Sequence, residues 1–229
     1  MTLKYIIGTG YVNRPDLLYR AVHSVKPCWK HAVIIDNSES EFFRREPFFS
    51  ERLTVYEPPV PLRYPQMMNL MQKWGKEKGC DVILFFHSDA EVHPGTVEQF
   101  LSELETMKAE GRKWGVAFTN YDVLVAYNME AVREVGQWDT VFYDYHADID
   151  YYRRLQLAGY EIVYTSLGVT HCNGGSNTSK SDTYRRYLFE NVTFAYFHTY
   201  YQIKWGGPIG GEVYTLPFNR FPLNPDHIR

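Results

Sequence analysis

The chain lacks long apolar runs and an excess of positive charge. No stretch approaches the roughly 18 consecutive apolar residues of a membrane-spanning helix, and glycine and polar side chains soon interrupt the apolar start. We therefore expect neither a transmembrane segment nor a signal peptide. Lysine and arginine number 24 against 27 acidic residues, a net charge of −3, so composition gives no reason to expect a nucleic-acid partner.

Cysteine is also scarce. Cys28, Cys80 and Cys172 are odd in number and have the spacing neither of a zinc site nor of a disulfide framework. A reducing compartment fits this usage, and with no export signal the expected location is cytoplasmic.

Aromatic side chains, in contrast, are abundant, at 17% of the 229 residues with 19 tyrosines and 5 tryptophans. They can stack on sugar rings, but they are equally ordinary core and interface material. The length suits one large domain, or one domain with a C-terminal extension.

Hydrophobic patterning predicts alternating strands and helices. The expected strands are at residues 4–8, 32–35, near 54, 81–86, 115–118, 122–127 and 160–165. One helix is expected to begin near residues 13–16, a second near 65, and a short one is expected to end near 136. Three further helices are expected at 96–108, 147–157 and about 182–205. This alternation predicts an α/β fold with a mainly parallel central sheet flanked by helices.

Polar residues follow two of the expected strands directly. Asp36 ends the run at 32–35, while His87, Asp89 and Glu91 come after the run at 81–86. In open α/β sheets, ligands bind at the carboxyl ends of the strands. The sequence therefore predicts a ligand site at this edge.

Several segments together resemble the family 2 glycosyltransferases, over roughly residues 3–172. In order, they are residues 9–21, 33–38, 81–95, 135–139 with 147–160, and the late His171. The resemblance implies a GT-A nucleotide-diphospho-sugar transferase fold and inverting transfer from a nucleotide sugar, with a UDP-sugar as the expected donor. It also implies a carbohydrate or glycoconjugate acceptor and a Mn²⁺ or Mg²⁺ cofactor.

The same resemblance suggests a domain plan. Residues 1–181 are expected to form the catalytic domain, with a nucleotide-sugar half at about 1–95 and an acceptor half at about 96–181. Residues 182–229 are expected to form an aromatic helix and tail packed on that domain.

A divalent cation can neutralise the diphosphate that leaves during glycosyl transfer. Asp89 is the expected first metal ligand and His171 the second. Glu91 is two positions beyond Asp89, so these two form an alternative acidic pair if the strand continues. His87 departs from the family pattern, which has an acid there, and is expected to bind the nucleotide by hydrogen bonding.

Asp148 is the expected catalytic base, which would take the proton of the acceptor hydroxyl. Ala147 departs from the glutamate that the family usually has at that position, without removing the base itself. Asp150 and His146 are alternative candidates, and either acid can instead stabilise the start of a helix.

The nucleotide pocket is expected to include Thr9, Tyr11, Arg14 and Asp36. Tyr11 would stack on the base, Arg14 would pair with a phosphate, and Asp36 would accept from a uracil N–H group. We expect Asp36 to be exposed enough to be removed without leaving a buried hole. A glycine-rich loop at 173–180 is a candidate to close over the diphosphate.

Two other functions remain open at this stage. A sugar nucleotidyltransferase shares the sheet and acidic metal site, but would normally have a glycine-rich basic loop after the first strand. A non-catalytic nucleotide-sugar or carbohydrate-binding protein is the second alternative, suggested by His87 and Ala147.

Overall fold

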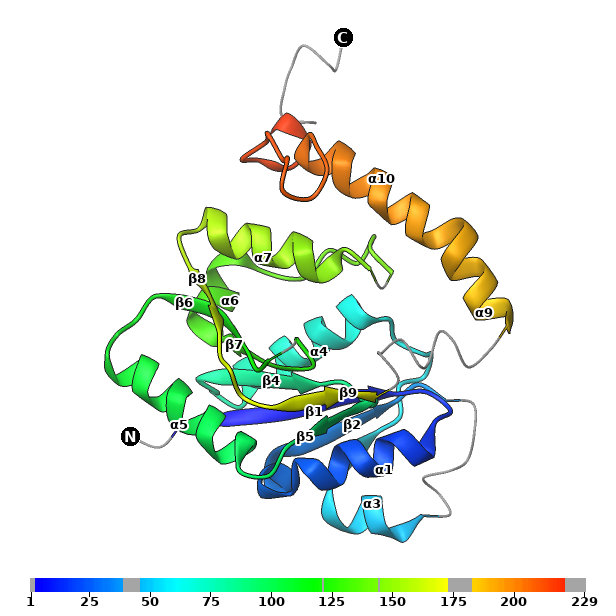
Figure 1. Ribbon diagram of the computed structural model, residues 1–229, viewed down its shortest axis with the longest axis vertical. Coiled ribbons are helices and arrows are strands. Elements are labelled where there is room, and N and C mark those ends of the chain that lie inside the picture. The colour runs from blue at the N-terminus through cyan, green and yellow to red at the C-terminus, as the bar shows by residue number, and fades with distance from the viewer. Residues whose placement is uncertain (1–2, 39–45, 121, 144, 173–182, 221–229) are drawn as a thin grey trace.

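The computed structural model describes residues 3–38, 46–120, 122–143, 145–172 and 183–220. Within these ranges the expected α/β architecture is confirmed. A seven-stranded, mostly parallel sheet lies between two layers of helices (Figure 1). None of the helices in these ranges has the length and apolar character needed to cross a bilayer.

The central sheet has the strand order β3-β2-β1-β4-β7-β6-β8. β1 is parallel to both β2 and β4, and β7 is antiparallel to its neighbours β4 and β6. The side chains of β2, β4 and β6 are all buried, as is usual for strands covered on both faces. The strands are β1 (Tyr5–Tyr11), β2 (Ala32–Asp36), β3 (Thr54–Tyr56), β4 (Val82–Phe86), β6 (Trp114–Phe118), β7 (Leu124–Asn128) and β8 (Glu161–Tyr164).

The helices agree closely with the sequence pattern, because their apolar residues recur at helical spacing. They are α1 (Pro15–Ser24), α3 (Pro47–Arg52), α4 (Tyr64–Glu77), α5 (Thr96–Ala109), α6 (Met129–Val135), α7 (Ala147–Leu157), α9 (Thr183–Leu188) and α10 (Phe194–Trp205). Short 3₁₀ segments lie at Lys26–His31 and Pro217–Arg220. The pattern did not predict α3 or these short segments.

Two hydrophobic cores cover the two faces of the sheet. One contains buried side chains of α1, α3 and α5, and the other those of α4, α6, α7 and α10. Gly8 of β1 lets α4 approach the sheet, since a Cβ atom at this position would lie 2.5 Å from Met71 Sδ. The second core therefore joins the sheet to the C-terminal helix.

The long aromatic helix expected at about 182–205 is present as α9, a π-helical turn (Phe189–Thr193) and α10. Figure 1 shows α10 beside α7, on the side of α7 that faces away from the sheet. Phe197, Tyr201 and Trp205 of α10 are buried in the second core.

Candidate active site

The candidate site lies where the carboxyl ends of β1, β2 and β4 meet. β2 and β4 pair with opposite sides of β1, so the chain changes direction across the sheet at this point. Such a topological switch point leaves a crevice beyond the strand ends. Asp36 is the last residue of β2, and His87 directly follows β4.

A small second sheet brings a distant part of the chain to this edge. β5 (Ala90–Val92) pairs antiparallel with β9 (Val169–His171), and Ala90 is opposite His171. The Cys172 N–H group also donates to the Asp89 carbonyl at 2.8 Å. This pairing places His171 beside Asp89.

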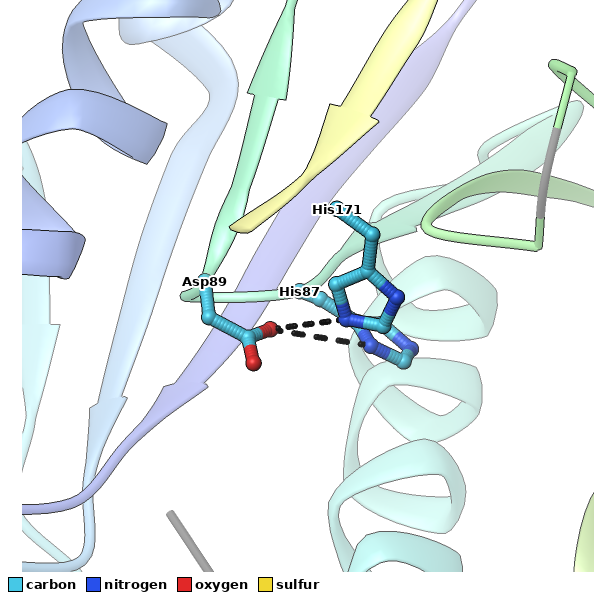
Figure 2. A group of neighbouring side chains, drawn as sticks. All are labelled: His87, Asp89 and His171. Carbon is cyan, nitrogen blue, oxygen red and sulfur yellow. Dashed lines mark hydrogen bonds and ion pairs between the residues drawn. The ribbon is translucent and has the colours of Figure 1, made fainter. Parts of the chain in front are cut away.

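His87, Asp89 and His171 form a compact group of possible metal ligands. Asp89 Oδ1 is 3.1 Å from His171 Nε2 and 4.0 Å from His87 Nδ1. One ligand atom from each residue lies within 4.8 Å of the others. Figure 2 shows both imidazoles turned toward the Asp89 carboxylate. His87, expected at the nucleotide, thus lies in the same group as the two expected metal ligands.

The chemistry of these donors fits a divalent cation. Two imidazoles and one carboxylate suit a transition metal such as Mn²⁺ better than Mg²⁺, which prefers oxygen ligands. Burial lowers the pKa of His87, against the opposing effect of Asp89, and favours the neutral imidazole that a metal requires.

Glu91, the alternative partner of Asp89, is engaged elsewhere. Its Oε2 atom is 2.5 Å from Nη2 of Arg20 on α1. Among the described residues, Glu91 is not a member of the group that could hold a metal. The geometry thus favours the two histidines over Glu91 as companions of Asp89.

Asp148 lies in the first turn of α7 and is half-buried. Burial is the main cause that raises its pKa to about 6, and repulsion by Asp122 adds to the shift. One carboxylate oxygen accepts a hydrogen bond of 2.9 Å from the Ile149 N–H group. A carboxyl group with this pKa can both take and release a proton near neutral pH.

Asp150 has a different environment, although it is only two residues away. Its side chain is 0% exposed. It accepts from Trp205 Nε1 at 2.8 Å and Arg154 Nε at 3.1 Å, and Lys204 Nζ is 2.7 Å away. Enclosed by these donors, Asp150 is poorly placed to receive a proton from an acceptor.

His146 directly precedes α7 and is 4% exposed. Its Nε2 atom is 3.3 Å from Nδ1 of His198 on α10. Burial is the larger cause that lowers the pKa of His146, and repulsion from His198 is the smaller one. This ring contacts the C-terminal helix and has little access to an acceptor.

The expected nucleotide residues are only partly brought together. Arg14 forms an ion pair of 2.7 Å with Asp16, which raises its pKa, and it is close enough to Asp89 for that carboxylate to add to the effect. Thr9 is fully buried, and Tyr11 is 1% exposed within the first core. In this conformation Tyr11 offers no free face to a base.

Asp36 lies next to Tyr11 in the register of β1 and β2. The expectation that its side chain is exposed was wrong, because it is 7% exposed. Its Oδ1 atom accepts hydrogen bonds from the Ser38 N–H group at 2.9 Å and the Ser38 hydroxyl at 2.5 Å. Burial raises its pKa, and the Ser38 hydroxyl and N–H group oppose this shift. The candidate loop at 173–180 lies outside the described residues.

Comparison with solved structures identifies the fold. The chain is similar to S. aureus TarS, with a TM-score of 0.60, 10% identity, and coverage of 82% of this chain and 40% of that one. It is also similar to GalNAc-T7 bound to UDP, GalNAc and Mn²⁺, with a TM-score of 0.61, 13% identity, and coverage of 89% and 51%. Both are glycosyltransferases. The chain has a GT-A fold.

A third similar structure is residues 1–349 of TarS in complex with UDP, with a TM-score of 0.55, 10% identity, and coverage of 72% of this chain and 58% of that one. The GT-A chain described here thus spans two fifths to three fifths of the length of these structures. No protein-family model and no curated protein sequence matches it.

Sequence reasoning missed one charged residue at this edge of the GT-A sheet. Asp122 was expected inside a strand, but β7 begins only at Leu124 and Asp122 is exposed in the turn before it. Its charge acts on both Asp148 and His87. Asp122 therefore adds a negative charge that influences both groups, and its place at the very start of the strand expected at 122–127, where a strand meets a turn, was the available signal.

A group of tyrosines was also missed. Tyr152 is one helical turn beyond Asp148, and its hydroxyl is 3.4 Å from that of Tyr127 on β7. Burial raises the pKa of both hydroxyls, and Asp148 adds to the shift in each case. In the sequence, tyrosines at these positions cannot be distinguished from ordinary core residues.

Proposed function

We propose that this chain is an inverting glycosyltransferase that moves a sugar from a UDP-sugar to an acceptor hydroxyl. The observation that carries this proposal is the cluster of His87, Asp89 and His171 at the switch point of a GT-A sheet. The UDP and Mn²⁺ in the GalNAc-T7 structure, and the UDP in the TarS complex, support this choice of donor and cation.

In this proposal the donor diphosphate binds beside the three metal-ligating side chains. When bound there, a divalent cation supplies positive charge that offsets the charge developing on the departing diphosphate. Arg14 is within electrostatic range of Asp89 and adds a second positive charge on this side. Asp36, at the end of β2, accepts from the uracil imide N–H group.

Asp148 acts as the base from the other side. Its carboxylate takes the proton of the acceptor hydroxyl while that oxygen forms a bond to the anomeric carbon. The bond from the anomeric carbon to the diphosphate breaks on the opposite face and UDP leaves with its electron pair. One such in-line displacement inverts the anomeric configuration.

Aromatic side chains near the start of α7 support an acceptor site next to Asp148. Phe194 of α10 has its ring centroid 5.8 Å from that of Tyr145 and 5.4 Å from that of His146. Phe194 is also 42% exposed. Rings of this kind offer a stacking surface for a carbohydrate.

The test is a panel of UDP-sugars and sugar acceptors in Mn²⁺, with UDP release and product formation both measured. We expect acceptor-dependent UDP release for at least one pair, and a product whose anomeric proton in NMR shows the inverted configuration. UDP binding without turnover across the panel would favour the non-catalytic binding protein, and retention of configuration would contradict the role of Asp148.

A further inference from the structure

The C-terminal helix α10 contacts the chain on both sides of Asp148, at the residue just before α7 and in the first turn of α7. His198, near the middle of α10, reaches His146, which is two residues before Asp148. Lys204 and Trp205, at the end of α10, reach Asp150, which is two residues after it. The turn that presents the proposed base is therefore held at both ends by one element.

The contact at Asp150 is directional and fully buried. Oδ1 of Asp150 receives Trp205 Nε1–H at 2.8 Å and lies 2.7 Å from Lys204 Nζ, while Oδ2 receives Arg154 at 3.1 Å. A buried charge pair adds little net stability compared with a well-packed apolar group, but it is favourable only within a small range of distances and angles. This group therefore defines where the first turn of α7 lies.

Lys204 also connects this group to the loop before α7. The same ammonium donates to Asp139 Oδ2 at 2.7 Å, and the Tyr200 hydroxyl donates to that oxygen at 2.9 Å. Burial alone would raise the pKa of Asp139, but the Lys204 contact holds it below its usual value. Lys204 of α10 thus binds both Asp139, in the segment before α7, and Asp150, in the first turn of α7.

The contact at His146 holds a strained backbone. His146 has a φ of +68°, a left-handed conformation that costs free energy in a residue with a side chain. Its Nδ1 atom is buried with no hydrogen-bond partner among the described residues, so the contact of Nε2 with His198 is the one polar contact of this side chain within that part of the protein. The surrounding structure must therefore maintain this conformation, and α10 is the element that contacts the ring.

We propose that α10 is a positioning element for catalysis, in which Trp205 and His198 hold the Asp148 carboxylate in line with the donor sugar through Asp150 and His146. This inference rests on the proposed function of Asp148 as the base. None of the α10 residues touches the reacting atoms in this arrangement. Their contribution is to keep the first turn of α7 fixed while the acceptor binds.

The test uses two full-length variants, Trp205→Phe and His198→Ala. Trp205→Phe keeps an aromatic ring but removes the N–H donor to Asp150, and Lys204 and Arg154 still pair with that carboxylate. We expect kcat to fall roughly 10–100-fold, as for a base displaced by about 1 Å, while the donor KM changes less than about twofold. Trp29→Phe is the matched control, since it removes an indole hydrogen bond of 2.8 Å to Val22 away from the site.

A second readout does not depend on turnover. Carbon-13 NMR of the Asp148 carboxyl group, identified by its loss in Asp148→Asn, should show a lower titration midpoint in both variants because a loosened turn admits water. If the wild-type protein transfers no sugar, the proposed function fails and this titration alone tests the positioning. Folded variants with unchanged kcat and an unchanged Asp148 titration would overturn the inference. If Trp205→Phe does not fold, kcat and the Asp148 titration of His198→Ala decide whether the inference holds.

Discussion

Asp89 and His171 lie side by side, with 3.1 Å between Oδ1 and Nε2, although 82 positions separate them in the chain. The pairing of two three-residue strands, β5 and β9, creates this contact. A carboxylate and an imidazole at this distance are close enough for a hydrogen bond, and they can bind one cation together when a metal is present. The relationship underlies the first two predictions.

Mn²⁺ should raise the affinity for UDP by about tenfold or more, the effect of one strong charge-assisted contact. Asp89→Asn should abolish this gain, because the amide oxygen carries no full negative charge. Calorimetric titration of UDP in Mn²⁺ and in EDTA measures both effects. Glu91→Gln is the control, since Glu91 pairs with Arg20 instead, and equal UDP binding in Mn²⁺ and EDTA would argue against the metal site.

His87→Ala separates a metal-ligating role from a nucleotide-binding role for this side chain. If His87 is a ligand, the variant should bind Mn²⁺ at least about tenfold more weakly in the absence of UDP, because one of three donors is lost. Electron paramagnetic resonance of free Mn²⁺ gives the affinity directly. Unchanged Mn²⁺ binding together with weaker UDP binding would show that His87 contacts the nucleotide and is not a metal ligand.

The turnover number should rise with pH through about pH 6 and level off above it. The proposed base must be ionised, and burial with repulsion from Asp122 raises the pKa of Asp148 to about 6. Asp148→Asn should lower kcat roughly 10²–10⁴-fold at pH 7 while leaving donor affinity near that of the wild type. Near-wild-type turnover in this variant would rule out the proposed base.

Asp148→Asn should also stabilise the fold near neutral pH. A carboxyl group whose pKa is raised in the folded state binds protons more strongly there, so its effect on stability becomes less favourable as pH rises from about 4 to above 6. Removing the charge should therefore add about 1–3 kcal/mol to the free energy of unfolding at pH 7. Urea denaturation at pH 7 and pH 4 provides the check. The gain should shrink at pH 4, and a gain independent of pH would point to a cause other than ionisation.

Asp36 offers a paired test of nucleotide contact and folding. Asp36→Asn keeps an acceptor for Ser38 but loses the charge, so UDP affinity should fall by about 1.5–3 kcal/mol with little change in unfolding free energy. Asp36→Ala should additionally destabilise the fold by about 1–3 kcal/mol, because the partly buried N–H and hydroxyl groups of Ser38 lose the Asp36 carboxylate as an acceptor. An unchanged UDP dissociation constant in both variants would remove Asp36 from the pocket.

Local patterning was enough to predict the main elements. Buried runs such as 81–86 and amphipathic repeats such as 96–108 form strands and helices because their side chains must cover the faces of one sheet. The same patterning placed Asp36, His87 and Asp89 at strand ends, where a parallel sheet gathers its ligands. These properties depend on neighbours close in sequence, so the sequence alone determined them.

Only the tertiary structure decided which of these residues lie together and which are enclosed. The β5–β9 pairing put His171 against Asp89 and drew His87 into the same group, and strands of three residues are too short for periodicity to reveal. Asp148 and Asp150 are almost indistinguishable in sequence, but α10 encloses Asp150 with Lys204 and Trp205 and leaves Asp148 half-buried. Burial and charge pairing depend on contacts between segments far apart in the chain, and the sequence pattern does not contain them.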